Sequence, residues 1–172
     1  MSDKKMYYFN SLALVSIVLP MLLSCEPSQP KLSCTSGTLV TVPARPDDWR
    51  KDVFTSTNIQ AQAGNSLKFS ASGTWDIGLG AMRPDGRDDW CECVISKAIN
   101  NGFRGPVGAL VGRIGENGKP FLIGSEKIII TDESGLLYLA SNENMGPCNG
   151  TDRGSCYYDN RGTLDVCIQV GK

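Results

Sequence analysis

The sequence predicts an all-β chain, folded as an antiparallel two-sheet β-sandwich over residues 38–171. Short runs of alternating apolar and polar residues recur along the chain, as expected for strands that bury one face. Glycine (19 residues) and proline (9 residues) are spread throughout and place turn signals between these runs. The 3.6-residue periodicity of an amphipathic helix is nearly absent. Many short strands at close spacing are typical of a sandwich or barrel.

The individual strands follow from their alternation. In the run 66–75, Leu67 and Phe69 point to one face, whereas Lys68 and Ser70 point to the other. The same pattern places the remaining strands at 37–42, 58–63, 108–115, 120–124, 127–131, 135–140 and 162–170.

The stretch 76–107 is the least strand-like part of the chain, being rich in Gly, Asp and Arg. We expect a long excursion at one end of the sandwich, with one helical turn near 96–101. The excursion also carries a dense acidic group, which we interpret as a solvated loop: Asp85, Asp88, Asp89 and Glu92.

Residues 1–24 are predicted to be a lipoprotein signal peptide. A positively charged start precedes the apolar run 11–23, whose length suits the hydrophobic region of a signal peptide better than a membrane span. The run ends in Leu-Leu-Ser-Cys, which resembles a bacterial lipobox, so we expect lipidation at Cys25 and a tether over 25–37. The implied location is the bacterial cell envelope, lipid-anchored in the outer membrane. An ordinary secretory signal is the alternative.

Seven cysteines are present, and six remain when Cys25 is set aside. An even number in an exported chain indicates disulfides. Alternation in 162–170 points Cys167 away from the apolar face, so its partner should lie over the outer surface, and Cys34 is the natural candidate. The other pairings stay open, either as two local bridges or as bridges between the two regions: Cys91, Cys93, Cys148 and Cys156.

Composition excludes several classes of function. The chain has no histidine, which removes Ser-His-Asp and Cys-His catalysis and histidine-ligated metals. We therefore expect no enzymatic activity. The net charge of −1 provides no basic surface for nucleic acid.

The loop 141–160 is much longer than a hairpin turn requires, although predicted strands lie on both sides of it. Loops of this length are usually functional or disordered. Side-chain oxygens are concentrated in it, at Asn142, Glu143, Asn144, Asn149, Thr151, Asp152, Asp159 and Asn160. The loop is thus either a ligand-binding element or a solvated loop held by its own cysteines.

Six segments together resemble the calcium-dependent galactose-binding bacterial lectins of the PA-IL type. They are VPARPDDW, TNIQAQAGNSLKFSASGTW, RPDGRDD, PVGALVGRIGENGKPFLIGS, SGLLYLASNEN and YYDNRGTLDVCIQV, which cover roughly 42–170. The resemblance implies a galactose-binding-domain-like sandwich that binds Ca²⁺ in the long loop. It also implies that the partner is a galactose-like glycan, which, together with the lipobox-like site, predicts a membrane-anchored lectin.

The resemblance also implies which residues form the site. The calcium ligands would be the side chains of Glu143, Asp159 and Asn160 and a backbone carbonyl of Ile77 or Gly78. This set suits calcium, which takes six to eight oxygen ligands. The sugar would contact Asp88, Trp90, Glu143, Asn144 and Asp159.

Two departures from the family pattern bear on these roles. Glu143 stands where the family commonly has Asp, and the histidine that contacts the sugar has no counterpart. Trp90 either stacks on a sugar or anchors its loop. The alternative function is a structural or adhesion lipoprotein with a degenerate sugar site.

Overall fold

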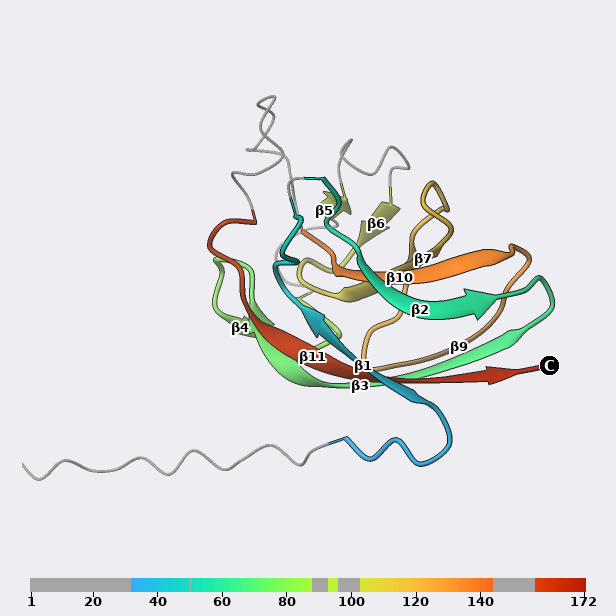
Figure 1. The fold of residues 1–172 in the computed structure, drawn as a ribbon. Helices are drawn as coiled ribbons and strands as arrows, with labels where there is room; N and C mark the ends of the chain where they lie inside the picture. Colours follow the sequence, from blue (N-terminus) through green and yellow to red (C-terminus); the bar gives the residue numbers. More distant parts are fainter. Residues whose placement is uncertain (1–31, 50, 88–92, 96–102, 144–156) are drawn as a thin grey trace, which may run out of the picture.

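The computed structural model describes residues 32–49, 51–87, 93–95, 103–143 and 157–172, and these residues form two antiparallel sheets without a helix (Figure 1). The fold class predicted from the sequence is thereby confirmed. The helical turn expected near 96–101 lies outside the described residues. In the described part of the chain, no helix is long and apolar enough to cross a membrane.

The first sheet has the order β1-β11-β3-β4, and β9 also pairs with β3. Its strands are β1 (Thr38–Pro43), β11 (Arg161–Gly171), β3 (Ser66–Asp76), β4 (Ala81–Met82) and β9 (Glu126–Ile130). The second sheet has the order β2-β10-β7-β8. Its strands are β2 (Thr55–Ala61), β10 (Gly135–Ser141), β7 (Leu110–Ile114) and β8 (Phe121–Leu122).

The excursion that follows β4 contains a separate two-stranded sheet. It consists of β5 (Cys93–Ile95) and β6 (Phe103–Gly105), which pair antiparallel. The prediction of an excursion with little strand is therefore only partly right.

The core lies between the two main sheets, where the alternation placed it. Leu67 and Phe69 of β3 are fully buried, as are Leu164 and Val166 of β11. Burying a side chain of this size stabilises the fold by about 1.5–3 kcal/mol. Only the far end of β11 departs from the pattern, since Val170 is 48% exposed.

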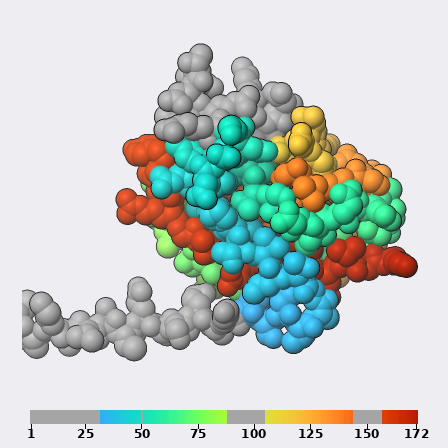
Figure 2. Space-filling view, viewed as in Figure 1, coloured from blue at the N-terminus to red at the C-terminus, as the bar shows by residue number. Residues whose placement is uncertain are grey.

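The outer surface of the first sheet carries the disulfide between Cys34 and Cys167, with Cα atoms 5.4 Å apart. The predicted pair is confirmed, because the outward phase of Cys167 lets the incoming chain meet it. Figure 2 shows the N-terminal segment, in blue, on the surface next to β11, in red. The other four cysteines form no pair that the described residues show.

The second sheet is covered on its outer face by the segment 51–54, which precedes β2. Phe54 of this segment packs with Val111 of β7 and with Tyr157. The guanidinium of Arg113 lies 4.2 Å from the centroid of the Phe54 ring and pairs with the Asp52 carboxylate. These contacts hold this segment against the second sheet.

Candidate functional site

The turn after β3 is shaped by Asp76. Its Oδ1 accepts hydrogen bonds from the backbone N–H groups of Gly78, Leu79 and Gly80 at 2.8, 3.1 and 2.9 Å. Gly78 has a φ of 81°, and a Cβ there would lie 2.5 Å from Oδ2 of Asp159. Glycine therefore allows both the left-handed turn and the close approach of the Asp159 carboxylate.

Two polar side chains are buried where the long loop leaves β10 and returns to β11. Glu143 is 6% exposed and Asn160 is 2% exposed. The Asn160 Nδ2 donates to Oε2 of Glu143 at 2.7 Å and to the carbonyl oxygen of Ala44 at 3.2 Å. Because the Ala44 carbonyl can only accept, this contact fixes the orientation of the amide.

The fixed amide leaves the Oδ1 atom of Asn160 buried and without a hydrogen-bond partner among the described residues. Native proteins pair nearly all buried polar atoms, so an unpaired acceptor calls for a donor or a cation. The same amide contacts the carboxyl of Glu143 through its Nδ2, and Asp159 is the preceding residue in the chain.

Glu143 is held in an environment that disfavours its negative charge. Burial raises its pKa from 4.5 to about 8, the hydrogen bond from Asn160 opposes this rise, and the nearby charge of Asp159 adds to it. Without a cation, the group is therefore mostly protonated at neutral pH. A cation here would stabilise the ionised form, because opposite charges lower the pKa of a carboxyl group.

Tyr157 lies near enough to Glu143 to sense its charge and is 1% exposed. Burial raises the pKa of its phenol well above 10, and the charge of Glu143 raises it further. The Ser141 hydroxyl lies close enough to oppose this rise. Neither hydroxyl, however, reaches a partner with hydrogen-bond geometry within the described ranges.

The end of β10 is fastened to the segment before β7. Asn142 donates its backbone N–H to Ala109 O at 2.7 Å and its Nδ2 to Pro106 O at 2.8 Å, and its own carbonyl accepts from Gly108 N–H at 2.5 Å. The Trp75 Nε1 donates to the Gly108 carbonyl at 2.8 Å, which ties β3 to the same segment. The backbone that carries Glu143 is thus anchored to both sheets.

The structure brings three predicted ligands, Glu143, Asp159 and Asn160, to one end of the sandwich. The Ile77 side chain is buried in the core, and the turn that it begins lies against Asp159. The predicted sugar contacts Asp88, Trp90 and Asn144 lie outside the described residues, as do Cys25, Cys91, Cys148 and Cys156. For Cys93, the structure places only the backbone, in β5.

Among the described residues, no three side chains of His, Cys, Asp or Glu lie together in a way that could hold a metal. A metal at this end of the sandwich would therefore depend on amide and carbonyl oxygens as well as carboxylates. Those are ligands that calcium accepts and that zinc rarely uses.

Sequence reasoning missed two residues that shape the site. The Ala44 carbonyl orients Asn160, and no local signal in the sequence connects positions so far apart. Asp76 organises the turn against Asp159. Its pattern, an Asp followed by Gly78 and Gly80, is a recognisable turn signature.

Comparisons with known proteins give a likeness among solved structures. No protein-family model matches the chain, and no curated protein matches it. Among solved structures, the fold is similar to one described as the EclA N-terminal domain, a PllA-like lectin. The TM-score is 0.49 with 20% sequence identity, and the match covers 77% of this chain and 94% of that chain. At this level, the likeness concerns the arrangement of strands and assigns no residue a role.

Proposed function

We propose that this chain is a calcium-dependent carbohydrate-binding protein whose site lies between the β3–β4 turn and the two ends of the long loop. The observation that carries the proposal is the buried, unpaired Oδ1 of Asn160, whose amide is fixed in orientation by Glu143 and Ala44. A carboxyl, a carboxylate and an amide oxygen at one place suit a hard cation. Calcium accepts such a mixed set of oxygens.

In this proposal, calcium would be held by Glu143, Asp159 and Asn160, with a backbone carbonyl of the 77–78 turn. When bound, the ion supplies coordination positions for two neighbouring sugar hydroxyls. The protein's own part is to hold the acceptors in place through Asp76 and Ala44. A galactose-like glycan is the ligand that the sequence resemblance suggests.

The structural alternative has its own support. The hydrogen bond from Asn160 to Glu143, with the raised pKa of that carboxyl, shows how the buried pair can persist without a cation. In that case, the protein is a structural or adhesion lipoprotein with a degenerate sugar site.

Calcium titration separates the two functions. We expect calorimetry to show heat of binding, and we expect millimolar calcium to raise the melting temperature. The stabilisation should be about 2.7 kcal/mol when calcium is at one hundred times its dissociation constant. Asp159→Asn should weaken calcium binding by about tenfold, or about 1.4 kcal/mol, and reduce glycan-array signals with it.

The matched control for this experiment is Asp165→Asn, which makes the same charge change on β11. Asp165 lies on the outer surface, where it accepts a hydrogen bond from the Thr41 hydroxyl at 2.8 Å. This variant should bind calcium as the wild type does. Absence of both heat and melting shift in the wild type would favour the structural function. Glycan binding that persists in chelator would separate sugar recognition from the metal.

Attachment to the membrane is a separate part of the proposal and rests on the Leu-Leu-Ser-Cys site alone. Cys25→Ser should move the protein from the membrane fraction to the soluble fraction. Unchanged fractionation would show that Cys25 does not carry the anchor.

A further inference from the structure

Strand β9 forms an open edge of the first sheet. Within the described residues, it is hydrogen-bonded only to β3, without a register shift along its length (Figure 1). The ladder bonds from Ala71 N–H to Ser125 O and from Thr131 N–H to Asn65 O fix which β9 residues face β3. Because the bonded positions alternate in an antiparallel pair, the backbone groups of residues 126, 128 and 130 point to the free edge.

This edge is unusually apolar. Ile128 is 63% exposed and Ile130 is 69% exposed, and both lie on the outer face of the sheet. Exposed edge strands are commonly protected by proline, a bulge or an inward charge, since their unpaired groups template pairing with another chain. Strand β9 has neither proline nor bulge, and its one charge on the inner face is Lys127. Such an edge is suited to a partner strand.

The edge is complementary to itself. In an antiparallel arrangement centred on Ile128, this residue faces its own counterpart, and Glu126 faces Ile130 of the second copy. Every free backbone N–H and C=O of residues 126, 128 and 130 then has a partner. If the two strands were centred on residue 126 or on residue 130 instead, part of this edge would remain unpaired.

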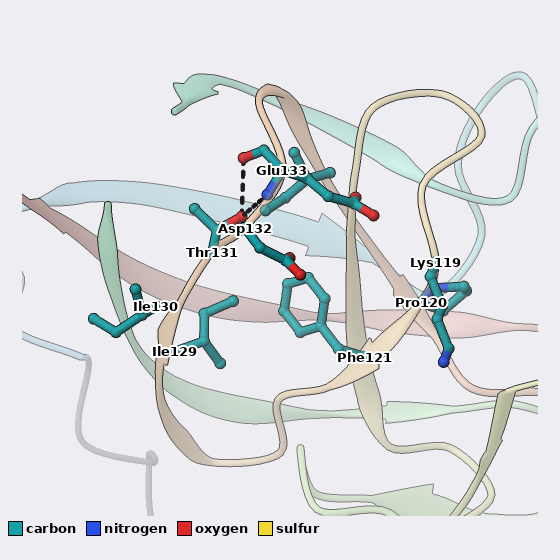
Figure 3. Close-up of a pocket in the computed structure, with 9 residues that line it drawn as sticks. Lys119, Pro120, Phe121, Ile129, Ile130, Thr131, Asp132 and Glu133 are labelled. Atoms are coloured by element: carbon teal, nitrogen blue, oxygen red, sulfur yellow. Dashed lines mark hydrogen bonds between the residues drawn. The ribbon is translucent and has the colours of Figure 1, made fainter. Parts of the chain in front are cut away.

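A cavity of about 380 Å³ lies on the inner side of the same strand. It is lined by Phe121 and Ile129, with the carboxylates of Asp132 and Glu133 near the Phe121 ring (Figure 3). Lys119 also lines it, so the rim carries two carboxylates and one ammonium. Neither carboxylate forms an ion pair within the part of the chain that the structure describes. In the arrangement centred on Ile128, Ile129 faces Lys127 of the second copy. The Lys127 ammonium of one copy thus comes to the acidic rim of the other.

We propose that two copies of this chain associate through their β9 edges, in the register centred on Ile128, and so join their first sheets into one continuous sheet. The charge complementarity between Lys127 and the cavity rim identifies a second copy as the occupant. The cavity and the candidate calcium site lie at opposite ends of β10. Association therefore leaves the candidate site open in both copies, and it does not depend on the function proposed for that site.

Disulfide trapping in the full-length chain tests the register. Directly opposed residues in a hydrogen-bonded antiparallel pair have Cα atoms about 5.5 Å apart, within the range that a disulfide spans. Ile128→Cys should therefore give a dimer on a non-reducing gel, well above the background of the unmodified chain. Ile130→Cys alone should stay at background, and adding Glu126→Cys to it should restore the cross-link.

The control is Gln60→Cys on β2, an exposed position on an edge strand of the second sheet and away from the Cys34–Cys167 bridge. It should remain at background. Ile128→Lys should raise the dissociation constant at least tenfold by sedimentation, with an unchanged melting temperature as evidence of folding. A wild-type chain that sediments as a monomer at 100 µM, or an Ile128→Cys chain that does not cross-link, would overturn the proposal. Equal cross-linking through Gln60→Cys would overturn it as well.

Discussion

In calcium-free buffer, Glu143→Gln should be more stable than the wild type at pH 9 and about equally stable at pH 4. Burial raises the pKa of Glu143 to about 8 in the folded chain, from 4.5 as its ordinary value. The folded protein therefore holds a proton that the unfolded chain releases, and wild-type stability falls as the pH rises from about 4.5 to about 8. Glutamine keeps the shape and the acceptor for Asn160 but cannot ionise.

The difference between the two proteins should reach roughly 5 kcal/mol at pH 9, since a tenfold change in an acid dissociation constant corresponds to about 1.4 kcal/mol. Urea unfolding at several pH values measures this difference in unfolding free energy. Groups that titrate elsewhere in the chain affect both proteins equally and therefore cancel. Glu133→Gln is the control, since Glu133 is exposed and should follow the wild type at every pH. If the difference in unfolding free energy between Glu143→Gln and the wild type did not change with pH, the prediction of a buried, neutral carboxyl at Glu143 would be wrong.

Replacing both Cys34 and Cys167 by alanine should destabilise the oxidised protein by about 4 kcal/mol. The two cysteines are 133 residues apart, so their bridge restricts almost the whole unfolded chain. In the chain-entropy account, the stabilisation grows slowly with loop length and approaches this value for loops of about one hundred residues. For a domain of this size, the melting temperature should fall by roughly 10 °C.

The control must separate the covalent bond from the docking of the N-terminal segment. Ser36→Ala serves, because it removes the hydrogen bond from Gln169 Nε2 to the Ser36 hydroxyl at 2.9 Å and keeps the bridge. Such an exposed bond contributes about 1 kcal/mol or less. Equal losses in the two variants would show that the segment's packing, and not the bridge, provides the stability.

Much of the sandwich could be predicted because strand alternation is a local property. Leu67 and Phe69 are buried where the sequence placed them, and the outward phase of Cys167 led to its partner Cys34. Strand boundaries are less well predicted. The strand predicted at 120–124 shortens to Phe121–Leu122, because the regular ladder with β7 ends there and the next two N–H groups, of Ile123 and Gly124, both turn to the Leu110 carbonyl.

The resemblance to the PA-IL-type lectins proposes members for the candidate site, Glu143, Asp159 and Asn160, but no local pattern predicts their surroundings. Their burial, the raised pKa of Glu143 and the unpaired oxygen of Asn160 depend on Ala44, which is more than one hundred positions away. No local pattern contains such a contact.

The sequence by itself determined the all-β class, the faces of the main strands and the bridge between Cys34 and Cys167, because each depends on residue type at a period of two. Only the tertiary structure decided that β9 is an open edge. The run of isoleucines at 128–130 has the same local pattern whether its strand is central or peripheral. Strand order is set by contacts between distant segments, so only the packed sheets show that Ile128 and Ile130 stay exposed while Ile129 joins the core.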